Sequence, residues 1–125
     1  MDVQRNPVSW FEIPVSDLEK ARRFYQVVFG LELSVQQMGP SKMAWFPMKQ
    51  GGAGAAGTLM SSPGYTPSHA GTLVYFEVDD IEAALAKIGA NGGRTLMPKT
   101  SIGEYGFIAH FQDCEGNRVA VHSVR

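Results

Sequence analysis

Alternating apolar and polar side chains predict a first strand over residues 8–15. Phe11, Ile13 and Val15 fall on one face of this strand, and Trp10 and Glu12 fall on the other. Alternation with a period of two is typical of a strand that buries one face and leaves the other open. The first strand is therefore expected to carry an aromatic and acidic surface opposite its core-facing side.

The pattern changes to a helical period after residue 15. Ser16 and Glu19 have the spacing of a capping box, which predicts a helix that begins at Asp17. Gly30 can adopt the left-handed backbone conformation that ends a helix. The apolar stripe between these limits consists of Leu18, Ala21, Phe24, Tyr25, Val28 and Phe29. Three short strands are then expected near residues 31–36, 42–49 and 57–62.

The second half of the chain repeats this order. A strand over residues 72–78 leads to Asp79 or Asp80 as a helix cap, and Gly89 is expected to close the helix. Further strands are expected near residues 94–98, 105–112 and 117–124. Each half is too short to close a core alone. The sequence therefore predicts an α+β fold with two tandem βαβββ modules in a single domain over residues 1–125. Module one covers about residues 7–62, the connector 61–70 and module two about 71–125.

Composition and charge exclude several classes of protein. The chain is 44% hydrophobic with a formal net charge of -1, and its basic residues form no dense cluster, so binding to nucleic acid or an anionic membrane is not expected. A single cysteine fits a reducing compartment. The first residues have no leader-like pattern, and no apolar run has the length of a membrane span. We expect a cytoplasmic protein.

Three short motifs together indicate a family. The chain carries Asp17-Leu18-x-x-Ala21-x-x-Phe24-Tyr25, then Val78-Asp79-Asp80-Ile81, and then Asp113-x-x-Gly116-Asn117. In this order and spacing they resemble the vicinal oxygen chelate superfamily, which includes glyoxalase I, bleomycin-resistance proteins and extradiol dioxygenases. The nearest resemblance is to small bacterial proteins described as glyoxalase-related. It implies a cupped, mixed and partly antiparallel sheet that holds a metal or a ligand.

The resemblance also implies one metal ligand from the first strand and one carboxylate from the last strand of each module. The first-strand positions are Trp10 and Leu73, and the last-strand position of module two is Ala120. Module one has no acidic residue between Leu33 and Phe76. Because these side chains cannot donate to a metal, we expect no metal at these positions and no cofactor.

The predicted strands place several candidate ligand-binding side chains on the cup side. Glu12 and Glu77 could act as acid or base, or could clamp a cationic ligand, and they could equally be solvated carboxylates or lie at a subunit contact. Aromatic residues could form a floor for a planar ligand or could belong to the core. The candidates on these strands and loops are Trp10, Glu12, Trp45, Leu73, Tyr75, Glu77, Glu104, Tyr105, His110 and His122.

The histidines leave alternatives open. His110 and His122 could meet across the last hairpin as a proton shuttle, or form an unusual metal site with Glu12, Glu77 or Glu104. They could also be ordinary hydrogen-bonded or exposed side chains. Cys114 is expected to be a turn residue, because its acidic neighbours raise the thiol pKa and disfavour a nucleophile.

Three functions follow from this pattern. The first is a metal-independent small-molecule-binding protein, like bleomycin-resistance proteins, with its ligand in the cup. The second is an isomerase- or lyase-like enzyme that uses Glu12 or Glu77 as base with His122 as partner. The third is a regulatory or interaction domain. A homodimer is expected in each case, because exposed sheet edges and cup rims could be covered by a symmetric partner.

Overall fold

The computed structural model describes residues 4–125, and this part of the chain has the α+β architecture predicted from the sequence. Residues 1–3, part of the stretch expected to lack a leader pattern, lie outside the described residues. The first module contains β1 (Trp10–Pro14), α1 (Leu18–Phe29), β2 (Ser34–Met38), β3 (Ser41–Trp45) and β4 (Ala56–Ser61). The second contains β5 (Tyr75–Glu77), α2 (Ile81–Ala90), β6 (Arg94–Ser101), the 3₁₀ turn η1 (Gly103–Tyr105), β7 (Phe107–Gln112) and β8 (Arg118–Ser123).

The strands form two four-stranded sheets of the same topology. Their orders are β1-β4-β3-β2 and β5-β8-β7-β6. In each sheet the first strand runs parallel to the last, and the other neighbours are antiparallel. Val15 N–H donates to the Met60 carbonyl at 2.9 Å, and Val78 N–H donates to the His122 carbonyl at the same distance. These matching bonds confirm the internal repeat that aligns Val15 with Val78.

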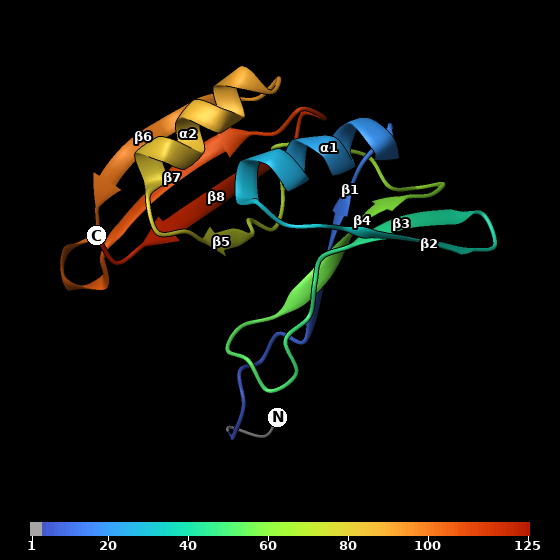
Figure 1. The fold of residues 1–125 in the computed structure, drawn as a ribbon, viewed down its shortest axis with the longest axis horizontal. Coiled ribbons are helices and arrows are strands. Elements are labelled where there is room, and N and C mark those ends of the chain that lie inside the picture. Colours follow the sequence, from blue (N-terminus) through green and yellow to red (C-terminus); the bar gives the residue numbers. More distant parts are fainter. Residues whose placement is uncertain (1–3) are drawn as a thin grey trace.

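An aromatic cluster joins the two modules. The Phe76 ring lies 5.6 Å from Phe11, 4.6 Å from Phe29 and 5.3 Å from Phe46, measured between ring centroids. Figure 1 shows α2 across the second sheet, and α1 beside α2 near the first sheet. The longer helix has only 12 residues, and within residues 4–125 no helix is long and apolar enough to cross a membrane. The modules thus share one core, as expected for halves too small to fold separately.

Each sheet has one face toward the core and one face turned away from the helices, which we call its open face. Ile13, Val15, Val119 and Val121 are buried, and they lie on the core side as the strand pattern predicts. Trp10, Glu12, Tyr75 and Glu77 are exposed on the other side. Strand alternation therefore sorts the side chains of both sheets correctly.

The ends of both helices differ from the sequence prediction. α1 begins at Leu18, and its N-cap is Asp17, whose carboxylate accepts the Lys20 N–H at 3.1 Å. Ser16 does not cap the helix, and the Ser16 N–H that a capping-box Glu19 would bind donates instead to the Glu115 carboxylate, as does the Asp17 N–H.

At the far end of the second helix, Gly89 does not close α2. The helix continues to Ala90, and Asn91 is its C-cap. The Asn91 amide donates to the Lys87 carbonyl at 2.7 Å, and Gly93 N–H donates to the Ile88 carbonyl at 2.9 Å. These bonds satisfy carbonyl groups that a helix end otherwise leaves unpaired, so the helix extends past the glycine.

Candidate functional site

The open face of the first sheet is mostly apolar. The Trp10 and Trp45 rings meet edge to face, with centroids 5.7 Å apart and planes at 80°. The Trp45 indole N–H points to the Met43 sulfur at 3.5 Å. Trp10 keeps 36% of its surface exposed. A flat, partly exposed indole of this kind can stack against a planar ligand.

One carboxylate interrupts this apolar surface. The Tyr65 hydroxyl, from the connector, donates to Glu12 Oε1 at 2.7 Å. This hydrogen bond raises the pKa of Tyr65, and the Glu12 charge adds to the effect. The strand neighbour of Glu12 is Thr58, which is buried and donates its hydroxyl to the Ala44 and Leu59 carbonyls. Glu12 is therefore held by the connector and has no acidic or metal-ligating neighbour in this register.

The open face of the second sheet is polar. His110 on β7 lies between Arg118 and Tyr75. Arg118 Nη2 and Nε lie 2.7 and 3.2 Å from His110 Nδ1, and the Tyr75 hydroxyl lies 3.2 Å from His110 Nε2. Burial lowers the pKa of His110 from 6.5, and the nearby Arg118 charge lowers it further. The arrangement therefore holds a neutral imidazole.

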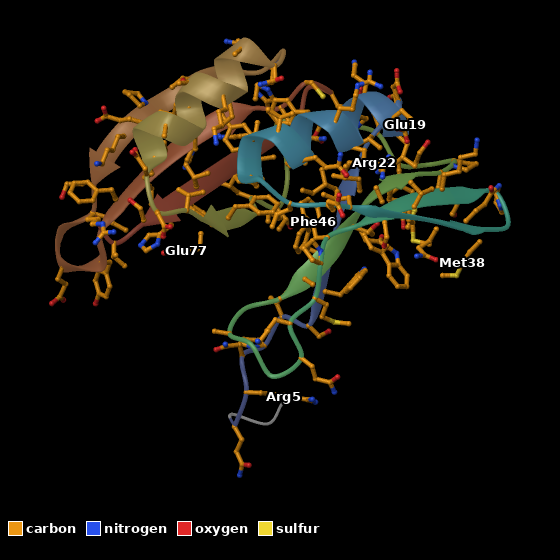
Figure 2. The ribbon with its side chains drawn as sticks, viewed as in Figure 1. Arg5, Glu19, Arg22, Met38, Phe46 and Glu77 are labelled. Atoms are coloured by element: carbon orange, nitrogen blue, oxygen red, sulfur yellow. The ribbon has the colours of Figure 1, made fainter. Side chains whose placement is uncertain are left out.

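A second histidine lies farther along the same face. His122 Nδ1 is 2.7 Å from Glu77 Oε1, and His122 Nε2 is 2.6 Å from the Tyr105 carbonyl oxygen. Figure 2 shows Glu77 at the end of β5, of which it is the last residue. The Tyr105 carbonyl raises the pKa of His122 from 6.5, and the hydrogen bond to Glu77 raises it further. Because both ring nitrogens face acceptors, His122 is held as a double donor, which is not the state of a general base.

The structure brings some predicted site residues together and separates others. Trp10 contacts Trp45, Tyr75 contacts His110, and Glu77 and the Tyr105 carbonyl contact His122. No hydrogen bond joins the two histidines or the two glutamates within residues 4–125, so the predicted proton shuttle is not assembled. The remaining candidates are Leu73, partly buried just before β5, and Glu104, exposed in η1.

The Asp113–Asn117 turn forms a buried hydrogen-bond network that binds α1. Asp113 is fully buried and accepts hydrogen bonds from the Tyr25 hydroxyl at 2.7 Å and from the Asn117 backbone and amide at 2.9 and 3.1 Å. Burial raises the pKa of Tyr25 well above 10, and Asp113 adds to the shift. Cys114 lies in this turn, where burial and the charges of Asp113 and Glu115 raise its thiol pKa to about 12. Its position as an unreactive turn residue agrees with the sequence prediction.

Two hollows lie away from the open faces. They measure about 410 and 640 Å³ and lie between the start of α1 and the β2–β3 hairpin. Both are lined in part by Ser16, Lys42 and Ser61. Neither includes a residue predicted for the site, and the helix N–H groups beside them already bind Glu115.

Sequence comparison assigns the family. Residues 8–121 match the Glyoxalase/Bleomycin resistance protein/Dioxygenase superfamily. The chain therefore belongs to this superfamily, and the family resemblance of its motifs is confirmed. A glyoxylase-like domain-containing protein from Didymella fabae is 30% identical over 128 residues, which cover 95% of this chain and 94% of that protein.

Solved structures agree with this assignment. TnmS3, an antibiotic binding protein from Streptomyces sp. CB03234, has 27% identity and a TM-score of 0.67 over 98% of both chains. A V278E mutant of glyoxalase I from Zea mays has 18% identity and a TM-score of 0.70. The match covers 94% of this chain but 46% of the maize enzyme, so the chain spans about half the length of that protein. The likeness to the maize enzyme supports the fold alone.

The residues of this chain do not fit a metal at the family positions. Trp10 and Leu73 occupy the first-strand positions, and neither has a donor atom suited to a metal. The last-strand positions are Ala120 and, by the matching register, Thr58, whose hydroxyl is already bonded to backbone carbonyls. Within residues 4–125, no group of three or more His, Cys, Asp or Glu side chains could hold a metal ion.

Sequence reasoning missed several polar residues on the open faces. Arg118 lies on the same face of β8 as Ala120 and His122, so the alternation of side chains along the strand could have identified it. Gln112 and Arg94 follow from the pairing of β7 with β8 and β6, which the sequence does not specify. Tyr65 lies in the connector, and no periodicity predicts its contact with Glu12.

Proposed function

We propose that this protein binds a small organic molecule on the open faces of its sheets. The observation that carries the proposal is the exposure of aromatic side chains: Trp10 and Tyr75 on the open faces are 36% and 47% exposed, and Tyr105 in the η1 turn is 71% exposed. Exposed aromatic groups beside fixed polar groups are typical of ligand sites. The similarity to an antibiotic binding protein supports the same function.

Ligand binding can be followed through tryptophan emission. The chain has two tryptophans, Trp10 and Trp45, and both lie on the first open face. A ligand stacked there should quench their fluorescence and raise the melting temperature. Trp10→Ala should weaken binding about five-fold, because stacking on an exposed indole contributes on the order of 1 kcal/mol. Val8→Ala, an exposed change near the same strand, is the control. Unchanged emission and melting temperature across a panel of planar aromatic compounds would contradict the proposal.

We also propose that binding requires no metal. The support is the donor-poor character of Trp10, Leu73, Thr58 and Ala120 at the family positions. Protein purified without a histidine tag should contain no stoichiometric metal, and its melting temperature should not change on chelation or on adding Ni, Zn, Mn or Fe(II). Stoichiometric binding of any of these metals would reject metal independence and would direct mutagenesis to His110 and His122.

The proposal includes a homodimer that pairs through β2. This edge strand, Ser34–Met38, has no charge, no proline and an unbroken register with β3. The edge strand β6 instead carries Arg94, Pro98 and Lys99 and has two register shifts. Natural sheet edges are usually protected by the features found in β6, so the unprotected β2 is suited to pairing. Figure 2 shows Met38 at the tip of the β2–β3 hairpin, where it is 60% exposed.

Sedimentation measures this association directly. Wild-type protein should sediment as a dimer, and Val35→Lys should produce monomer because it adds a charge to the strand edge. Val27→Lys is the matched control, because Val27 is similarly exposed but lies on α1. A monomeric wild type at tens of micromolar, or a V35K dimer, would reject this interface.

A cytoplasmic location completes the proposal. Its support is the lone cysteine, Cys114, which requires no oxidising compartment. Cell fractionation with the native chain tests it, and recovery outside the cytoplasm would reject it.

An isomerase- or lyase-type enzyme is the second candidate function. The observation that favours it is the Glu77 carboxylate, 64% exposed and 2.7 Å from His122 Nδ1. Wild type should then turn over a compound in a panel that includes methylglyoxal adducts, and a Glu12→Gln/Glu77→Gln double variant should not. Equal inactivity of both proteins would reject the enzyme.

A further inference from the structure

The second open face carries two arginines, Arg94 and Arg118, that no carboxylate pairs with in the described residues. The ion pairs within residues 4–125 join Lys20 with Glu115, Arg22 with Glu19, and His122 with Glu77. Arg94 and Arg118 are not among them. These two residues are linked through Gln112, because the strand register pairs Arg94 with Gln112 and Gln112 with Arg118. Both guanidinium groups therefore belong to one row across β6, β7 and β8.

The hydrogen bonds around Arg118 all run in one direction. A guanidinium can only donate, so His110 Nδ1 is the acceptor in the contact with Arg118. The proton of the neutral ring is then on Nε2, which donates to the Tyr75 oxygen. The Tyr75 hydroxyl proton is left to donate outward, and 47% of this side chain is exposed. The chain of bonds thus ends in a donor directed away from the protein.

Gln112 continues this pattern. Its side-chain oxygen accepts from Arg94 Nη2 at 3.3 Å and from His69 Nε2 at 2.8 Å. With the oxygen occupied, the Gln112 amide group keeps its N–H donors. We call Tyr75, Arg94, His110, Gln112 and Arg118 the donor cluster. Its outward atoms are N–H and O–H groups, with no carboxylate among its members.

The position of Arg118 argues against a purely structural role. It is partly buried and bonded to a neutral imidazole, whereas a partly buried guanidinium ordinarily pairs with a carboxylate. Taking a charge partly out of water without a counter-charge costs free energy. An anion at this face would supply the missing counter-charge.

We propose that the donor cluster binds a carboxylate or phosphate group of the ligand. The inference rests on the proposed small-molecule function and adds the class of ligand, which is an organic anion. The expected ligand charge is opposite to that of the cationic ligand considered from the sequence. The two acidic strand residues that would bind a cation already have partners: Glu12 accepts from Tyr65, and Glu77 pairs with His122. Guanidinium groups bind carboxylate and phosphate oxygens with paired N–H donors, so both anions share the chemistry of this site.

Inorganic phosphate tests the cluster independently of the organic part of the ligand. NMR signals of the Arg118 Nε–H and the His110 ring should shift to saturation with phosphate at constant ionic strength, and the shift should be lost in Arg118→Met. Arg23→Met, an exposed change on α1, should leave the titration unchanged. Arg94→Met should weaken binding as well, and because Arg94 is exposed this variant is the safeguard if Arg118→Met does not fold.

A series of naphthalene compounds then tests the ligand class by calorimetry. The acids 1-naphthoate and 1-naphthyl phosphate should bind at least about ten-fold more tightly than neutral 1-naphthylmethanol or cationic 1-naphthylmethylammonium, and the tighter acid identifies the preferred anion. Arg118→Met should remove this difference without weakening the neutral compound.

The outcomes separate the inference from the function on which it rests. Equal binding of all four compounds, with no saturable phosphate shift, overturns the donor cluster and leaves small-molecule binding in place. Saturable phosphate binding without binding of any naphthalene compound supports the cluster and counts against an aromatic ligand. Absence of both overturns both proposals.

Discussion

On the open face of the first sheet, two indole rings meet beside the Met43 sulfur and the one carboxylate is bound by a tyrosine, whereas the second sheet presents guanidinium, imidazole and phenol groups. The two faces have the same strand order and matching backbone bonds, so topology does not cause the difference. It arises at matched positions such as Met60 and His122. One fold thus provides an apolar surface on one sheet and a donor-rich surface on the other.

The modules also differ in how their helices are held, because residues of the last turn of module two bind α1, and the largest predicted effect concerns this contact. Asp113→Ala should lower the free energy of unfolding by about 3 kcal/mol, because it leaves the buried Tyr25 hydroxyl without its acceptor and removes one of the two acceptors of the Asn117 amide. The network has module-two residues on one side and α1 on the other. Urea unfolding followed by circular dichroism measures the change.

Tyr25→Phe is the informative companion to this variant. It removes one hydroxyl and leaves Asp113 with its Asn117 bonds, so its loss should be smaller than that of Asp113→Ala. If the two variants were equally stable, the bonds from Asn117 to Asp113 would contribute nothing measurable.

The next effect isolates the Glu115 bonds at the start of α1. Burial opposes ionisation of Glu115, but hydrogen bonds from Lys20 and from the Asp17 and Ser16 N–H groups hold its pKa below the usual range. Glu115→Gln should cost about 1–2 kcal/mol. Because the folded-state pKa is depressed, the contribution is present at neutral pH and disappears as the pH falls through that pKa.

Glu82→Gln is the matched control for Glu115→Gln. Glu82 lies in the first turn of α2 and is exposed, and no ion pair holds it within the described residues. Its replacement should change stability by less than about 0.5 kcal/mol. A similar loss for E115Q and E82Q would mean that the two helix starts are equivalent.

A smaller effect separates the two histidines of the second face. His122 has a raised pKa, so its contribution to stability is present below pH 6.5 and is lost as the pH rises through its folded-state value. His110 has a lowered pKa, so acidification below pH 6.5 destabilises the fold until this ring is protonated. NMR titration should place the His122 midpoint above 6.5 and the His110 midpoint below it. The reverse order would contradict both hydrogen-bond networks.

The smallest effect is expected at an exposed ion pair of module one. Glu19 and Arg22 lie on successive turns of α1, as Figure 2 shows, with Oε1 and Nη1 3.3 Å apart. Glu19→Gln should change stability by less than about 0.5 kcal/mol, since solvent screens such pairs. Thermal unfolding measures it, and a loss as large as that of E115Q would show that exposure does not distinguish the two carboxylates.

The sequence predicted the features that depend on local period. Strand alternation separated Trp10 and Glu12 from Ile13 and Val15, and helical spacing located both helices. It could not show that Glu115 binds the backbone at the start of α1, because this carboxylate is 99 residues away from Ser16 in the chain. Nor could it assign the ligand charge, because the side chains that engage Glu12 and Glu77 come from the connector and from β8.

The Glu115 bond to the start of α1 also constrains the order of folding. The helix is complete at residue 29, but its carboxylate partner is synthesised nearly ninety residues later. At ordinary rates of translation this delay is about 4–17 s. A 12-residue helix is marginal by itself. We therefore expect the nascent chain to hold module one loosely until the β7–β8 hairpin is synthesised, so that a turn of the second module completes the first half of the fold.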